Sequence, residues 1–150
     1  MANGTAKEPE GFGGWLLLVA IGQWLGVLWG FADLAASSPG WIAQWRDPAL
    51  RFATAGEAGL ALCLLAFVLY TAVVMNMKRR EFPLLFRIEA ALYVVVPLFS
   101  TWWVSSLAGT PVDRMNFAAI AIQAIAGTIG ASITILYSLR SARVRNTFVY

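Results

Sequence analysis

Apolar and polar positions occupy long, separate blocks along this chain. The apolar blocks predict helices over residues 13–35, 53–77, 83–107 and 112–138. A helix rises about 1.5 Å per residue, so about twenty apolar residues cross a hydrocarbon core of roughly 30 Å. The pattern therefore predicts an all-α fold, an integral membrane four-helix bundle that forms a single domain over residues 1–150.

The segment between the first two predicted helices has two interpretations. Pro39 and Pro48 interrupt the helical pattern, whereas Trp41 and Trp45 fall on one face of a helix. A short helix lying in the outer interface of the membrane fits this spacing. A plain loop whose tryptophans dip into the headgroups fits it equally well.

Pro97 lies in the middle of the third predicted helix. Its ring lacks the N–H that would bond to the carbonyl of Tyr93, so we expect a kink there. The hydroxyls of Ser100 and Thr101 could bond to the backbone groups that the proline leaves free.

The composition indicates that the helices lie in a lipid bilayer. Hydrophobic residues make up 59% of the chain and charged residues 13%, about half the charged share of a soluble domain. If both termini are cytoplasmic, most of the 11 Lys and Arg residues lie inside: Lys7, Lys78, Arg79, Arg80, Arg87, Arg140, Arg143 and Arg145. Basic loops face the cytoplasm, so we expect a multi-pass protein of the bacterial inner membrane with both termini inside.

Two basic clusters would then lie beside the inner membrane surface. The loop holds Lys78, Arg79 and Arg80, and the tail at 139–150 holds Arg140, Arg143 and Arg145. Each basic residue near an anionic leaflet gains about 1 kcal/mol. The predicted partner is therefore the lipid bilayer, with anionic lipid at its inner face, although orienting the helices would explain the same charges. We expect the tail to continue the fourth helix, with Phe148 folding back onto the membrane surface or the basic loop.

Small residues form rows on the first and fourth predicted helices. Gly22, Gly26 and Gly30 recur every fourth position as a glycine zipper, and Gly127 and Gly130 lie in similar rows. In lipid, close packing at such rows replaces hydrophobic collapse. The rows predict packing inside the bundle, or else contact with a membrane-protein partner or a second copy in a homo-oligomer.

Several polar side chains lie within the apolar blocks. Gln23 and Gln123 could form a hydrogen bond worth about 0.6–2 kcal/mol, or a pair that binds a solute. Glu89 lies at the inner boundary of the third helix, and we expect it to pair with Lys or Arg of the neighbouring loop or tail in a structural ion cluster.

Glu57 and Asp33 are the candidate proton- or cation-binding carboxylates. Both lie near the outer ends of predicted helices, where an acidic side chain is costly and often functional. For Glu57 the alternative is a capping box with Thr54, helped by the helix dipole. Asp33 could instead pair with an arginine of the outer loops or face water.

The chain lacks the residues that several kinds of catalytic and metal site require. The chain has no histidine and one cysteine, Cys63, so it offers no Ser–His or Cys–His nucleophile, no His–Glu zinc motif and no cysteine cluster. We therefore expect no enzymatic activity, no metal and no cofactor. We also expect no nucleic-acid binding, because the basic residues form short clusters beside the membrane rather than a stripe on a folded domain.

Two motifs at the ends of the chain resemble a known family. Gly13-Gly14-Trp15-Leu16 leads into the first apolar block, and Arg143-Val144-Arg145-Asn146-Thr147-Phe148 follows the last one. Together they resemble the bacterial membrane family named domain of unknown function 2569. The resemblance implies an integral inner-membrane protein with four helices, and it supplies no activity and no catalytic residue.

Two functions compete on this basis. The glycine rows favour a non-enzymatic accessory, assembly or oligomeric membrane subunit. The alternative is a small proton- or cation-coupled transporter in which Glu57 is the exchanging carboxylate and Pro97 a hinge. An enzyme acting on lipid has only the basic inner face in its favour.

Overall fold

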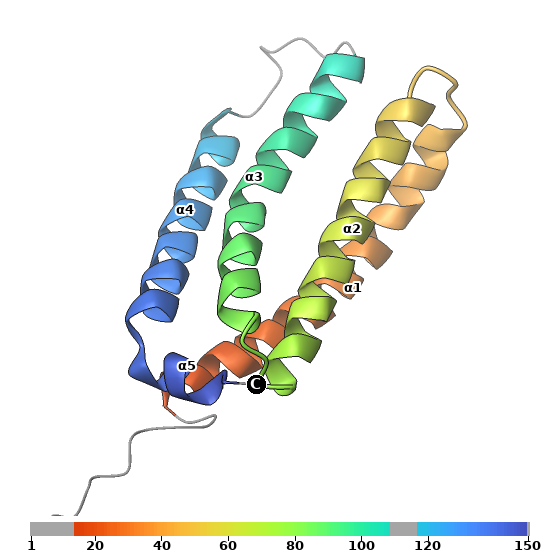
Figure 1. Cartoon of the computed structure of the whole chain (residues 1–150). Coiled ribbons are helices and arrows are strands. Elements are labelled where there is room, and N and C mark those ends of the chain that lie inside the picture. Colours follow the sequence, from red (N-terminus) through yellow and green to blue (C-terminus); the bar gives the residue numbers. More distant parts are fainter. Residues whose placement is uncertain (1–13, 109–116, 150) are drawn as a thin grey trace, which may run out of the picture.

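The computed structural model describes residues 14–108 and 117–149. Every regular element among them is a helix, which confirms the all-α prediction (Figure 1). The helices are α1 (Trp15–Trp45), α2 (Arg51–Asn76), α3 (Phe82–Ala108), α4 (Phe117–Arg140) and α5 (Ala142–Thr147). The fourth helix was predicted to begin at residue 112, and residues 112–116 lie outside the described residues.

Three helices in the described part are long and apolar enough to cross a membrane. They are α1, α2 and α3, and α4 carries a shorter apolar stretch, Ala124–Arg140. These candidate spans indicate a multi-pass membrane protein.

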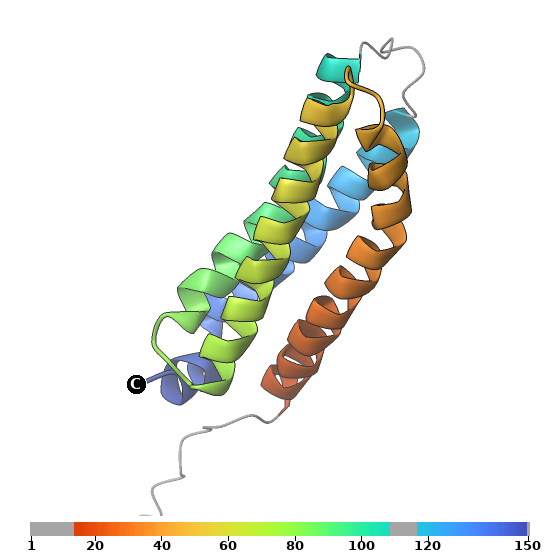
Figure 2. The same ribbon diagram turned by 90° about the vertical axis from the view of Figure 1, so that its right-hand side faces the viewer.

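The long helices pack in chain order, with α1 on α2, α2 on α3 and α3 on α4. In Figure 1, α4 lies beside α3 on the side away from α2, and α1 crosses behind α2. Turned by 90°, the bundle presents α1 in front of α4 (Figure 2). Among the described residues, α1 and α4 do not pack closely against each other. One side of the bundle therefore stays open.

α1 is longer than the sequence predicts. Its 31 residues span about 46 Å, which exceeds a hydrocarbon core of roughly 30 Å. Pro39 lies inside the helix and cannot donate to the carbonyl of Ala35, and the Ser38 hydroxyl donates to that oxygen instead, at 2.9 Å. The first helix therefore ends at Trp45 rather than at residue 35, and both the interfacial-helix and the loop predictions are wrong.

α3 continues through Pro97. The Thr101 hydroxyl donates to the carbonyl of Pro97 itself, at 2.8 Å, rather than to the carbonyl of Tyr93. The Tyr93 carbonyl lies toward α4 at Gly127, where an added Cβ would be 4.0 Å from the oxygen. A methyl group at Gly127 would thus be in ordinary contact with α3, next to the turn that the proline interrupts.

The tail does not continue α4, contrary to the prediction. The chain turns at Ser141, whose hydroxyl accepts a hydrogen bond from the Val144 N–H at 3.3 Å and caps α5. Phe148 then packs on Phe82, with ring centroids 4.4 Å apart. Phe148 therefore folds back onto the end of the basic loop, as one of the two predictions has it, and there joins a buried apolar cluster with Leu16, Val74, Met75 and Val144.

Candidate functional site: a groove with a buried carboxyl group

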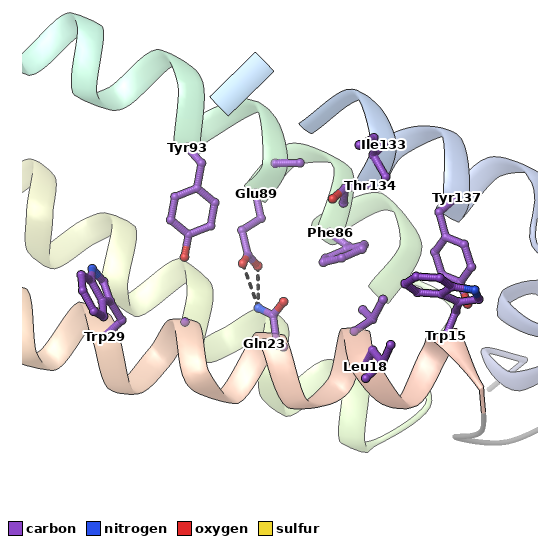
Figure 3. Close-up of a pocket in the computed structure, with 14 residues that line it drawn as sticks. Trp15, Leu18, Gln23, Trp29, Phe86, Glu89, Tyr93, Ile133, Thr134 and Tyr137 are labelled. Carbon is purple, nitrogen blue, oxygen red and sulfur yellow. Dashed lines mark hydrogen bonds between the residues drawn. The ribbon is translucent and has the colours of Figure 1, made fainter. Parts of the chain in front are cut away.

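A groove lies between α1 and α4, with α3 behind it. Its volume is about 730 Å³, within the range of small-molecule sites, about 300–1,000 Å³. Exposed side chains from both flanking helices form its edges, so the groove opens at the side of the bundle, where lipid would lie. Its largest lining side chains are Trp15, Trp29, Phe86, Tyr93, Ile133 and Tyr137 (Figure 3).

A hydrogen-bonded pair, Gln23 of α1 and Glu89 of α3, forms the floor of the groove. Nε2 of Gln23 donates to both carboxyl oxygens of Glu89, at 2.9 Å to Oε1 and 2.7 Å to Oε2 (Figure 3). Nε2 also lies 3.4 Å from the carbonyl oxygen of Val68 in α2. The side chains are 5% and 4% exposed. One amide group therefore holds α1, α2 and α3 together beneath an apolar groove.

No basic side chain in the described part of the chain compensates Glu89. Its other hydrogen-bonding neighbour is Thr71 of α2. The nearest basic residue along α3, Arg87, donates from Nε to the carbonyl of Pro83 at 2.9 Å. The predicted ion cluster at Glu89 is therefore wrong, because α3 turns the carboxyl group into the bundle rather than toward the basic loop.

The hydrogen bonding of Thr71 limits how it can interact with Glu89. Its hydroxyl donates to the carbonyl of Phe67 at 2.9 Å. A hydroxyl has one proton and two lone pairs, so Thr71 bonded in this way can accept a hydrogen bond from a protonated Glu89 but cannot donate a second one. The site thus holds either a neutral carboxyl group or an ionised one that a cation must balance.

A second cavity adjoins the groove beyond Tyr93. It has a volume of about 390 Å³, lies between α1, α2 and α3, and is lined by both Asp33 and Glu57. Gly26, Trp29 and Tyr93 line both spaces. The structure therefore brings the two predicted carboxylates to one cavity and places Glu89 on the far side of the Tyr93 ring.

The capping-box alternative for Glu57 is wrong. α2 begins at Arg51, whose N–H donates to the carbonyl of Asp47 at 3.2 Å, so the helix starts one turn earlier than a cap at Thr54 requires. The Thr54 hydroxyl donates to the carbonyl of Leu50 at 3.0 Å, as in a helix interior. Glu57 is half-buried in the second turn and does not complete a cap.

The comparisons with known proteins agree with the motifs at the two ends of the chain. The family model described as "Protein of unknown function (DUF2569)" matches residues 9–149. The chain belongs to the DUF2569 family. This confirms the resemblance seen in the sequence. No curated protein and no solved structure matches the chain.

The glycine row of α1 has three different surroundings in this DUF2569 chain. A Cβ added at Gly22 would meet nothing within 4 Å, and one at Gly26 would lie 3.5 Å from the Tyr93 hydroxyl. A Cβ at Gly30 would lie 2.8 Å from Cδ1 of Leu65 in α2. The row therefore leaves space for the groove at one end and permits close packing on α2 at the other.

The predicted residues on α4 differ in the same way. A Cβ at Gly127 would lie 3.5 Å from Cγ2 of Val94 in α3, whereas one at Gly130 would meet nothing within 4 Å. The side chain of Gln123 lies outside the described part of the structure, so its predicted bond to Gln23 stays a prediction. Gln23 itself is engaged by Glu89.

The two predicted basic clusters lie at one end of the bundle, where α2 joins α3 and α4 joins α5 (Figure 1). They are Lys78, Arg79, Arg80, Arg140, Arg143 and Arg145. Nε of Arg80 donates to the carbonyl of Val149 at 2.6 Å, which ties the loop to the tail. Contact with anionic lipid at this end stays a prediction.

Sequence reasoning missed the Gln23–Glu89 pair, although one signal for it was present. α1 and α3 run in the same direction, and the two residues lie about 12 Å and about 10 Å from the starts of these helices. Two polar side chains at matching depth in parallel apolar helices are natural partners. The negative charge of Glu89 instead predicted a basic partner.

Replacing Gln23 should destabilise the protein because it removes the amide donor from a buried carboxyl group. We expect Gln23→Leu to lose about 1–3 kcal/mol of unfolding free energy, and Gln23→Leu with Glu89→Leu to regain most of it, since both partners are then apolar. Unfolding of the purified protein in detergent measures this. The control Cys63→Leu alters an exposed side chain of α2 and should change stability by less than about 0.5 kcal/mol. A double variant as unstable as the sum of the two single ones would contradict the pairing.

Proposed function

We propose that this DUF2569 chain is a non-enzymatic accessory or oligomeric subunit of the bacterial inner membrane that binds a lipid-soluble molecule in its groove. The observation that carries the proposal is the groove of about 730 Å³ with the buried Gln23–Glu89 pair as its floor. A mostly apolar pocket with a few convergent polar groups is the usual form of a ligand site. An acidic side chain among membrane-spanning helices is costly, and such residues generally serve a function.

The lateral opening of the groove supports uptake from the bilayer. Trp15 and Trp29 of α1 are 73% and 77% exposed, and Ile133 of α4 is 63% exposed. A molecule dissolved in the lipid would meet these apolar edges first and could reach Glu89 without crossing the membrane surface. The excess of Lys and Arg at one end of the bundle supports a topology with both termini in the cytoplasm.

Filling the groove should expel its ligand. Ile133→Trp adds an indole to the groove wall, whereas Ile125→Trp makes the same change on α4 at a residue that is 61% exposed and does not line the groove. We expect mass spectrometry of organic extracts to find a molecule that co-purifies with the wild type and with Ile125→Trp but is lost from Ile133→Trp. Equal amounts with all three proteins, or no such molecule with the wild type, would contradict the proposal.

A second candidate function is a small proton- or cation-coupled transporter with Glu57 as the exchanging carboxylate. The convergence of Asp33 and Glu57 on the second cavity favours it. That cavity adjoins the groove at Tyr93, so acidic groups lie on either side of one tyrosine ring. Movement of this ring would then connect Glu57 with Glu89, and the proline one turn further along α3 lies where a hinge would allow it.

Removing the charge of Glu57 tests this second candidate. In proteoliposomes with an imposed pH gradient, we expect the wild type to dissipate the gradient, measured with a trapped pH-sensitive dye, and Glu57→Gln to abolish the flux. Glu81→Gln neutralises an exposed loop carboxylate and should leave the flux unchanged. The transporter idea fails if Glu57→Gln conducts like the wild type, or if the wild type dissipates the gradient no faster than empty vesicles.

A further inference from the structure

We infer that the groove binds an amphipathic organic cation, whose charged group pairs with Glu89 and whose apolar part lies against the aromatic side chains. The inference rests on the proposed function, that the groove takes a lipid-soluble molecule, and it names the chemical class of that molecule.

The charge of Glu89 favours a cation in the groove. The side chain is 4% exposed, and its hydrogen-bonding partners, Gln23 and Thr71, are both uncharged. A neutral donor stabilises an ionised carboxylate but leaves its net charge in place, and an isolated buried charge is strongly unfavourable. A proton or an external cation must therefore balance this carboxylate, and the groove is the space from which a cation can approach it (Figure 3).

The aromatic lining of the groove also favours a cation. Five aromatic side chains line the groove: Trp15, Trp29, Phe86, Tyr93 and Tyr137. Toward one end lie Trp15 and Tyr137, toward the other Trp29 and Tyr93, and Glu89 lies between them (Figure 3). The face of an aromatic ring attracts a cation, most strongly where water is excluded. A carboxyl group surrounded by such rings is suited to an organic cation rather than to an anion or to a neutral lipid chain.

The size of the groove favours a small molecule over a partner helix. A membrane-spanning helix about 10 Å across and 30 Å long occupies roughly 2,400 Å³, more than three times the groove volume of about 730 Å³. A partner helix could therefore not enter the groove as a whole, whereas the volume falls within the range of small-molecule sites. The ligand class is thus a small amphipathic cation, such as a quaternary ammonium or phosphonium compound with apolar substituents.

The test uses tetraphenylphosphonium as the probe, in equilibrium dialysis with the detergent-purified full chain. We expect saturable binding to the wild type that weakens roughly tenfold or more in Glu89→Gln, which keeps the size of the side chain but removes its charge. Glu89→Asp, which keeps the charge, should retain more of the affinity than Glu89→Gln does. Glu81→Gln, at an exposed loop carboxylate, should bind like the wild type.

A second measurement needs no variant and so does not depend on how a variant folds. Unlabelled tetraphenylphosphonium should displace the labelled probe from the wild type, whereas the neutral isostere tetraphenylmethane should not. Equal binding by Glu89→Gln and the wild type, equal displacement by the two competitors, or no saturable binding would overturn the inference. If the cation result fails while Ile133→Trp still loses a co-purifying molecule, the groove binds a ligand of another class. If both fail, the proposed function fails as well.

Discussion

The structure depends on one hydrogen-bonded contact, the amide of Gln23 on the carboxyl group of Glu89. An acidic group among membrane-spanning helices costs free energy unless it is neutralised and bonded, and within the described residues a single amide with one hydroxyl neighbour does the bonding. Because Gln23 also reaches the Val68 carbonyl, the contact fixes α1 against both α2 and α3. The position of α1, and hence the near wall of the groove, follows from this polar contact as much as from apolar packing.

The remaining packing keeps the groove open. At the end where α2 joins α3, the α5 segment and Phe148 form an apolar cluster with Leu16 and Phe82, which anchors the first turn of α1. At the other end Gly30 has no side chain, and α1 therefore packs closely against Leu65 of α2. Between these anchors α4 follows α3 rather than α1. A bundle whose first and fourth helices were packed against each other would bury the same carboxyl group but leave it without a route for any ligand.

The helical class, the apolar spans and the family could be read from the sequence because each depends on local pattern. The apolar blocks specify α2 and α3 nearly to their ends, since lipid requires an uninterrupted run. The extension of α1 through Pro39 could not be read in this way, because it depends on a hydroxyl of the preceding residue replacing the lost donor. The turn at Ser141 depends on tertiary burial of Phe148, which local pattern does not contain. The candidate site was not predicted for a related reason. The pairing of Gln23 with Glu89 depends on how α1 and α3 lie side by side, and the charge of Glu89 alone predicted the wrong partners.

Carbodiimide labelling tests most directly whether Glu89 is a buried carboxyl group reached from the lipid. Lipid-soluble dicyclohexylcarbodiimide and a water-soluble carbodiimide should be applied separately to the protein in native membranes, and the modified glutamates located by peptide mass spectrometry. We expect the lipid-soluble reagent to modify Glu89, and the water-soluble one to modify the exposed Glu81 but leave Glu89 unlabelled. If the water-soluble reagent labels Glu89 as readily as Glu81, the carboxyl group faces water rather than the apolar groove, and the burial described here is wrong.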